Sequence, residues 1–474
     1  MGPVFGLLYV LKQVADQIGI SAALGSREIG KLGLFLVLAR IAHQGSRLSA
    51  VRWAEAQAVA EVLGVQGFDE DDLYDALDDL CERQEKIEQV LYRHYLRQQK
   101  APPRLFLYDV TSSYLEGEHN ELGAYGYNRD GKRGKLQIVI GLLTDEQGEP
   151  LAVRVFEGNS GDPTTVADQI KILQEQFQVQ ELVFVGDRGM VKSKGRQAGC
   201  CNCLCSAKRS ARSSTSNCAT CCARTSPKPY ASSGVWRTSW RNWEPGSGHA
   251  IKRCSSNLCA SRRRACTPAT NDPSLGTPGL HPSDKDPSLG TPGLQQLQQW
   301  AQWHKLQALI QLRLEGTQVV LERQQQAIAR HLELAGCYVI TTDVAGTEMG
   351  SQQVHDSYMA LQRVERDFRS IKTGALEVRP IFVEKASRTR GHVFCCMLAL
   401  KLLREIEQRL RTAFGTTGDD PYAVTVADAL AALSRLCLLN YPAGKSGQVV
   451  TKLPHPNDTQ KKILHALKVS LPRM

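Results

Sequence analysis

The chain is 474 residues long, and 42% of these residues are hydrophobic while 22% are charged. This composition supports packed globular domains, about three of them at the usual domain size. No apolar run approaches the roughly 20 residues needed to cross a bilayer, so we expect no membrane partner. Lys12 and Asp16 interrupt the apolar start of the chain, and no small-residue cleavage site follows. These features predict a cytoplasmic protein without a signal peptide.

The formal net charge of +10 comes from one segment. Residues 196–271 contain 13 Lys and Arg residues and one acidic residue, Glu244, so the rest of the chain carries a formal charge of −2. Ten of the 15 cysteines lie in the same segment. Overall basicity is therefore weak evidence for a DNA-binding surface, because a single unusual stretch supplies all of it.

The first hundred residues have the apolar spacing of helices. We expect a short apolar helix at 32–41 and a charge-rich helix at 69–95. Pro102 and Pro103 end this region, because proline interrupts regular structure. Residues 1–100 are thus predicted to form a helical domain.

From residue 104 the pattern changes to short strands. Four strands, with one helix between the third and the fourth, predict the opening of a mixed sheet flanked by helices. Asp162 and Pro163 begin the helix as an N-cap and a first-turn proline. Asp109 ends the first strand, and Asp187 follows the fourth. The expected strands are 105–110, 136–143, 151–156 and 181–186, and the expected helix is 162–177.

Two strands that each end in an aspartate indicate a metal site. Carboxylates at one edge of a sheet can hold two divalent cations about 3.5–4 Å apart, which activate the attacking oxygen and neutralise the leaving oxygen in phosphodiester cleavage. Mg²⁺ suits such a sparse acidic set because it keeps waters and phosphate oxygens among its ligands. The alternative for either aspartate alone is an ordinary residue at a strand end or turn.

A third acid, Glu365, lies on a predicted helix over residues 356–372. Tyr358, Glu365 and Lys372 are seven residues apart, so they share an arc of about 40° and Glu365 can point at the sheet edge. The alternative is an amphipathic helix with a solvated charged margin. The expected buried face of this helix consists of Tyr358, Leu361, Val364, Phe368 and Ile371.

Together these motifs resemble the DDE transposases of bacterial insertion sequences. The resemblance rests on the motifs at 108–113, 185–190 and 358–372, and it covers residues 2–190 and 297–474. Tyr358, Glu365 and Lys372 fit the Y-R-E-K pattern of one branch of that family. Leu361 stands where the pattern has arginine, and Arg363 and Arg366, the candidate substitutes, point in other directions.

The resemblance implies an RNase H-like core in which Asp109, Asp187 and Glu365 bind Mg²⁺ or Mn²⁺. It also implies that Tyr358, Lys372 and Arg188 contact DNA phosphates. The implied reactions are hydrolytic nicking at the element ends and attack of the freed 3′-hydroxyl on target DNA. The implied partners are double-stranded DNA and a second copy of the chain in a homodimer, bound to a bacterial nucleoid.

Residues 196–294 show no helical or strand period, and they end in a nine-residue repeat at 272–280 and 286–294. One explanation is a zinc module built on two C-x2-C pairs, Cys200/Cys203 and Cys218/Cys221. A second is a basic, disordered DNA-binding linker. The favoured explanation is translation out of frame, because the composition changes abruptly after residue 196 and family-like residues return near 297.

Five regions follow from these observations. Residues 1–100 form the helical domain, whose N-terminus we expect to be truncated. The catalytic domain consists of residues 101–195 and 295–415, and the segment 196–294 interrupts it. Residues 416–474 form a helical tail. The expected function is that of a transposase. The alternatives are a catalytically inactive, degenerate product that at most binds DNA or a partner, and a general RNase H-like nuclease indifferent to end sequences.

Overall fold

In the computed structural model, the chain divides into two compact units, Met1–Ala219 with Thr342–Met474, and Thr220–Thr341. No helix in the described part of the chain is long and apolar enough to cross a membrane. The structure describes residues 2–132, 134–187, 190, 219–224, 292–316, 318–333, 337–379, 381–415, 424–443 and 448–473.

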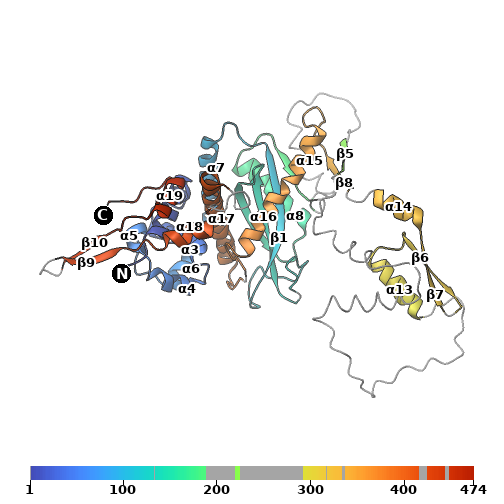
Figure 1. Ribbon diagram of the computed structural model, residues 1–474, viewed down its shortest axis with the longest axis horizontal. Coiled ribbons are helices and arrows are strands. Elements are labelled where there is room, and N and C mark those ends of the chain that lie inside the picture. The colour runs from blue at the N-terminus through green and yellow to red at the C-terminus, as the bar shows by residue number, and fades with distance from the viewer. Residues whose placement is uncertain are drawn as a thin grey trace, which may run out of the picture. The chain divides into compact units, whose positions relative to one another are not determined.

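Short helices make up the N-terminal part of the first unit (Figure 1). The helix expected over 69–95 is instead two helices, because Arg83 leaves the regular helical conformation and donates a hydrogen bond to the Leu24 carbonyl at 2.8 Å. Asp69 caps the first of the two with a capping box, which satisfies its free amide groups. The helices are α1 Gly6–Gln17, α2 Ile20–Leu24, α3 Glu28–Ala42, α4 Arg47–Ala54, α5 Val59–Leu63, α6 Glu70–Glu82 and α7 Gln84–Gln98.

A mixed four-stranded sheet follows in the order β3-β2-β1-β4. The first three strands are antiparallel neighbours, and β4 is parallel to β1 after a helical crossover. This confirms the expected order of strands and helix and the mixed α/β class. The elements are β1 Leu105–Tyr114, β2 Gln137–Asp145, β3 Pro150–Glu157, α8 Asp162–Lys171 with a following π-helical turn η1 Ile172–Gln176, and β4 Val183–Val185.

The limits of these elements differ from the expected ones in ways that affect the site. Strand β1 pairs with β2 as far as Tyr114 and Gln137, so Asp109 lies inside the strand and not at its end. Strand β4 is only three residues long and pairs on one side only among the described residues. The N-cap of α8 is Gly161, one residue before the expected Asp162.

Alternation along β1 divides its side chains between two apolar layers. Phe106 and Tyr108 point into a cluster with residues of α7, α8 and η1. Leu105 and Leu107 point into the main core of the unit. Asp109 continues the second set, so it faces the same side of the sheet as the C-terminal helices.

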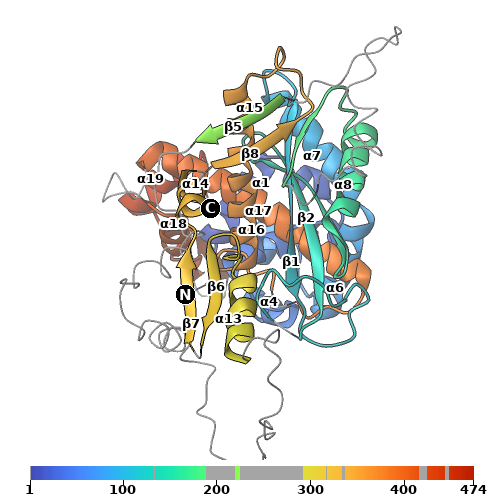
Figure 2. The ribbon, with the colours of Figure 1, turned by 90° about the vertical axis from the view of Figure 1, so that its right-hand side faces the viewer.

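The C-terminal part of the first unit covers that side of the sheet (Figure 2). The long helix α17 packs against α3, α6 and β3, so it joins the N-terminal helices to the sheet. A two-stranded hairpin lies between the two helices of the expected helical tail. These elements are α15 Ser351–Met359, α16 Leu361–Lys372, α17 Ala386–Phe414, α18 Val426–Leu433, β9 Leu439–Ala443, β10 Gln448–Lys452 and α19 Asp458–Ala466.

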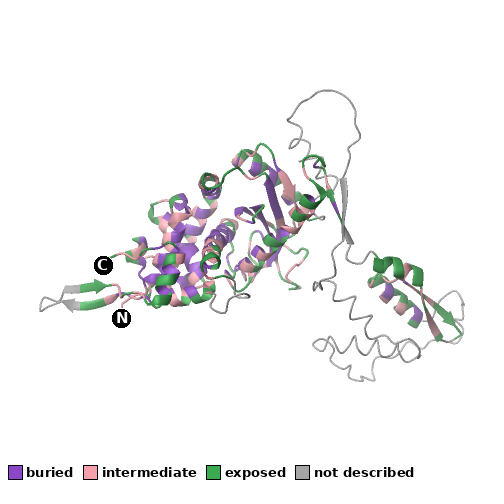
Figure 3. Cartoon of the chain, turned by 45° about the horizontal axis from the view of Figure 1, so that its top comes forward, coloured by how far each residue is buried: buried purple, intermediate pink, exposed green. Residues whose placement is uncertain are grey.

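The second unit is small, and its described side chains are mostly exposed or half-buried (Figure 3). The Gln-rich spacing that begins at residue 297 predicts a helix to about residue 314, but the helix ends at Trp303. It ends there because Lys305 adopts a positive φ of 57° and Leu306 donates its amide back to Ala301 in a helix-terminating turn. A strand hairpin follows that turn. The elements are β5 Ala219–Arg224, which pairs with β8 Cys337–Thr342, and α13 Pro292–Trp303, β6 Ile310–Glu315, β7 Gln318–Arg323 and α14 Gln325–Glu333.

Most of the interrupting segment at 196–294 lies outside the described residues. The same holds for the side chains of the two cysteine pairs considered for zinc, Cys200/Cys203 and Cys218/Cys221. The zinc, linker and frame-error explanations therefore stay predictions.

Candidate active site

The parallel pairing of β1 with β4 brings the two aspartates together. Leu105 lies opposite Val183 and Leu107 opposite Val185, so the same register continued by two residues sets Asp109 beside Asp187. Gly186 lies close to β1, since a Cβ built on it would be 3.6 Å from the Tyr108 carbonyl oxygen. The amide of Met190 then donates to the Asp187 carbonyl at 2.9 Å, and this turn returns the chain to the core.

Asp109 is a carboxylate in an unfavourable electrostatic position. The pKa of its side chain is raised to about 7, mainly by burial and also by the negative charges of Glu365 and Asp187. A hydrogen bond of 2.8 Å from the Val110 amide and the positive charge of Arg129 lower it. Asp187 and Glu365, which come from other elements, thus act on Asp109 through their charges.

Glu365 lies on α16, which packs against β1. The expected apolar face is confirmed for Leu361, Val364, Phe368 and Ile371, which are buried in the main core. Glu365 itself is exposed beside this face. The buried apolar face therefore anchors helix α16, and the side of the helix beside that face presents the Glu365 carboxylate to solvent near the sheet.

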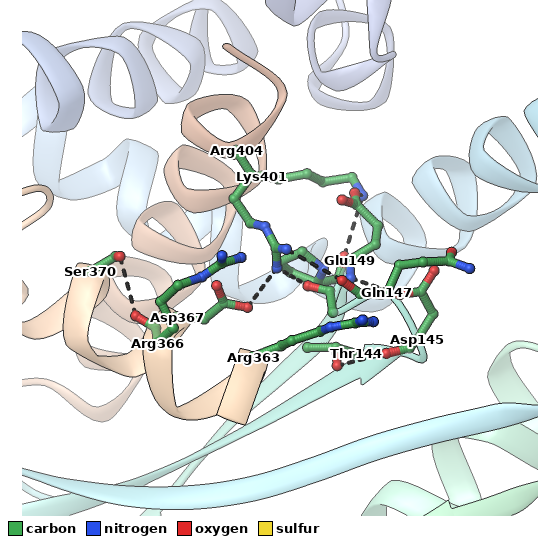
Figure 4. Close-up of polar contacts among 12 residues, drawn as sticks. Thr144, Asp145, Gln147, Glu149, Arg363, Arg366, Asp367, Ser370, Lys401 and Arg404 are labelled. Atoms are coloured by element: carbon green, nitrogen blue, oxygen red, sulfur yellow. Dashed lines mark hydrogen bonds and ion pairs between the residues drawn. The ribbon is translucent and has the colours of Figure 1, made fainter. Parts of the chain in front are cut away.

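Polar contacts fix α16 to the turn between β2 and β3 (Figure 4). Arg404 of α17 donates to the Asp367 carboxylate at 2.7 Å and also to the Gly148 carbonyl in that turn. Arg363 donates to the Glu146 carbonyl in the same turn. Both contacts lie within two residues of Glu365, so they restrict where its helix can sit.

The predicted continuous helix over 356–372 is wrong, because a turn at Ala360 separates α15 from α16. Tyr358 therefore lies on a different helix from Glu365 and Lys372, and the shared 40° arc holds for only the latter two. Tyr358 is half-buried against the core. Arg363 does not fill the missing arginine position, because it binds the β2–β3 turn.

Lys372 does not stand free for a phosphate. Its ammonium donates to Asp130 at 2.7 Å, and Arg379 lies 2.6 Å from the same carboxylate oxygen. Burial lowers the pKa of Lys372, an effect that Asp130 opposes. Arg188, the third predicted phosphate contact, lies outside the described residues.

Two cations at the site were not predicted from the sequence. Arg129 acts on Asp109 through its charge, and Arg379 joins Lys372 at Asp130. The signal for the first was present, since residues 129–135 contain four Lys and Arg residues between two predicted strands. No local pattern marks Arg379, whose partner is about 250 residues away in the chain.

The donor set suits a hard divalent cation, although the acids are not gathered into a complete coordination sphere. Among the described side chains, no group of three or more His, Cys, Asp or Glu residues is close enough to enclose a metal ion. A cation would nevertheless suit Asp109, whose pKa is raised mainly by burial and further by the charges of Glu365 and Asp187, because a positive charge offsets both effects. Oxygen ligands are also those that Mg²⁺ and Mn²⁺ prefer.

Comparisons with known proteins leave the function to be argued from this site. Neither a scan against protein-family models nor a search of curated proteins finds a match to the chain.

Proposed function

We propose that this chain is a DDE-type DNA transposase with an RNase H-like core, in which Asp109, Asp187 and Glu365 form the active site. The observation that carries the proposal is the parallel pairing of β1 with β4, which directs Asp187 toward Asp109, together with the charges of Asp187 and Glu365 that act on the buried Asp109. Asp109 lies in β1, Asp187 follows the end of the adjacent parallel strand β4 by two residues, and Glu365 lies on a helix that packs against β1. The order β3-β2-β1-β4 is also the order in which an RNase H-like sheet begins.

The three acids would hold Mg²⁺ or Mn²⁺, with water and DNA phosphate oxygens as further ligands. A bound divalent cation supplies an activated oxygen nucleophile and neutralises charge on the leaving oxygen. Asp109 is suited to this task because it sits inside β1, where the backbone fixes it, and because its raised pKa makes cation binding and proton release interdependent. Glu365 is exposed and free to approach DNA from α16.

The phosphate-binding role of Lys372 is retained in a modified form. Asp130 holds Lys372 and Arg379 together as a pair of cations with one negative charge between them, which leaves a net charge of about +1 for a phosphate. Arg129, fixed by Asp162 at 2.6 Å, adds a further positive charge near Asp109. These residues would position the DNA backbone beside the acids.

The test is nicking of a duplex that contains the DNA flanking the coding region, with either Mg²⁺ or Mn²⁺. Asp109→Asn should abolish nicking, because it removes a cation ligand while keeping the size of the side chain. Asp168→Asn is the matched control, since Asp168 is an exposed acid on α8 of the same unit. Absence of nicking with both metals would overturn catalysis and leave a non-catalytic DNA- or partner-binding product. Nicking that ignores the flanking sequence would identify a general nuclease.

A further inference from the structure

The connection between β1 and β2 carries an aromatic and cationic cluster on the surface, and its Arg129 acts on the charge of Asp109. Within residues 125–135 there are two tyrosines, four Lys or Arg residues and one acid, Asp130. The side chains of Tyr125 and Tyr127 are 70% and 81% exposed. Exposing large aromatic rings to water is energetically unfavourable in a free protein. Such rings are typical of surfaces that a binding partner covers.

The backbone beneath these rings is held firmly. The buried Gln137 side chain donates to the Tyr127 carbonyl at 3.1 Å and to the Gly158 carbonyl at 2.9 Å. Gly126 between the two tyrosines packs so tightly that a Cβ on it would lie 2.1 Å from the Gly158 oxygen. The exposed rings therefore stand on a fixed base, which lowers the entropy that a ligand must overcome to bind them.

A fixed cation lies beside one of the two rings. Arg129 lies 5.6 Å from the centroid of the Tyr127 ring, and Asp162 holds its guanidinium at 2.6 Å. Asp130, only 3% exposed, ties the connection to Lys372 of α16 and to Arg379. The cluster is thus joined to the helix that carries Glu365, and Arg129 also acts on the charge of Asp109.

We propose that Tyr125 and Tyr127 form a stacking platform for unpaired bases of single-stranded DNA, while Arg129 and the other cations of this connection contact its phosphates. The combination of exposed aromatic rings with fixed positive charge is the one that single-stranded nucleic acids recognise. Bases in a duplex offer no free face for such rings, so the platform selects single strands. This inference rests on the proposed function, because the acids and the platform would act on the same DNA.

The experiment measures fluorescence anisotropy of the full chain with a labelled single strand and with the matching duplex, in EDTA so that cleavage plays no part. Tyr127→Ala should weaken single-strand binding by roughly 5- to 150-fold, the range expected for one stacked base, and duplex binding by less than about twofold. Tyr127→Phe, which keeps the ring, should bind like the wild type. A 2-aminopurine base in the single strand should lose fluorescence on binding to the wild type and regain it with Tyr127→Ala.

Tyr441→Ala is the matched control, because Tyr441 is a half-exposed tyrosine on the distant hairpin strand β9. It should leave both affinities unchanged. Equal losses for single strand and duplex, or no loss with Tyr127→Ala, would overturn the platform. Asp109→Asn should bind single strands like the wild type although it does not nick. If the wild type does not nick DNA but Tyr127→Ala selectively weakens single-strand binding, the catalytic proposal falls and the platform stands. If the wild type nicks DNA but Tyr127→Ala has no selective effect, the platform falls and the catalytic proposal stands.

Discussion

Arg404 of α17 donates a hydrogen bond of 2.7 Å to Asp367 of α16, two residues from the candidate catalytic Glu365. The Asp367 side chain is only 2% exposed, and the same guanidinium reaches the Gly148 carbonyl in the β2–β3 turn. One arginine thus connects the long helix, the helix of the third acid and the sheet that carries Asp109 (Figure 4). Burial raises the pKa of Asp367 to about 7 even though Arg404 opposes that shift.

Removing this arginine should destabilise the protein. Arg404→Leu leaves the Asp367 carboxylate buried without its partner, a change that costs about 3 kcal/mol of unfolding free energy. Urea unfolding followed by circular dichroism measures the loss. Arg411→Ala is the control, because Arg411 forms an exposed pair with Glu407 one turn away in the same helix, and such pairs contribute less than about 1 kcal/mol. Similar losses for both variants would contradict a special role for Arg404.

The raised pKa of Asp109 makes the stability of the metal-free protein depend on pH. A folded pKa of about 7 is above the ordinary value of 3.8, so the folded state binds the proton more tightly than the unfolded state. The resulting stabilisation is present at low pH and is lost as the pH rises through about 7. Between pH 5 and pH 8 the loss from Asp109 should be about 2–3 kcal/mol.

Asp109→Asn isolates this contribution, because Asp367 titrates in the same range and persists in both proteins. Urea unfolding in EDTA at several pH values should show a steeper fall for the wild type than for the variant. Parallel curves would show that Asp109 is ionised in the folded state throughout this range.

The sequence was sufficient for the features that follow a local period. The strands around Asp109 and the buried face of α16 were predicted because alternation and helical spacing record which side chains meet the core. The break in the helix at Ala360 was not predicted, because alanine favours helix and the turn there depends on packing of the whole chain. Strand β1 is also longer than the predicted strand 105–110, because the largely polar residues Thr111 to Tyr114 continue its pairing with β2. The ion pairs of Asp130 with Lys372 and Arg379 join residues about 250 positions apart in the chain, and no local sequence pattern indicates such pairs.

Divalent cations should stabilise the folded protein through the three acids. Millimolar Mg²⁺ at pH 8 should raise the unfolding temperature of the wild type. The free energy of unfolding should increase by about 2.7 kcal/mol when the cation is at a hundred times its Kd. Asp109→Asn should lose most of this gain, whereas Asp168→Asn should keep it. Thermal unfolding with and without EDTA gives the measurement. An equal gain in all three proteins would assign the effect to general ionic strength.

The two sides of α16 should separate activity from stability. Glu365→Gln changes an exposed side chain, so the unfolding free energy should stay within about 0.5 kcal/mol while nicking is lost. Phe368→Ala removes a ring that is 5% exposed and should cost about 3–5 kcal/mol. The two variants are compared by urea unfolding and by nicking of the same duplex. A stable Glu365→Gln protein that nicks normally would remove Glu365 from the site.

Lys372 should contact DNA phosphate only if it can act while bound to Asp130. Each phosphate that a protein neutralises contributes about 0.9 to the slope of log affinity against log salt concentration on duplex DNA. Lys372→Met should therefore reduce that slope by about 0.9, measured by anisotropy over a series of salt concentrations. Lys171→Met is the control, because Lys171 is an exposed lysine on α8 that lies 3.7 Å from Glu175. An unchanged slope for Lys372→Met would mean that Asp130 neutralises this lysine, and that Lys372 serves to hold the β1–β2 connection against α16 and not to bind DNA.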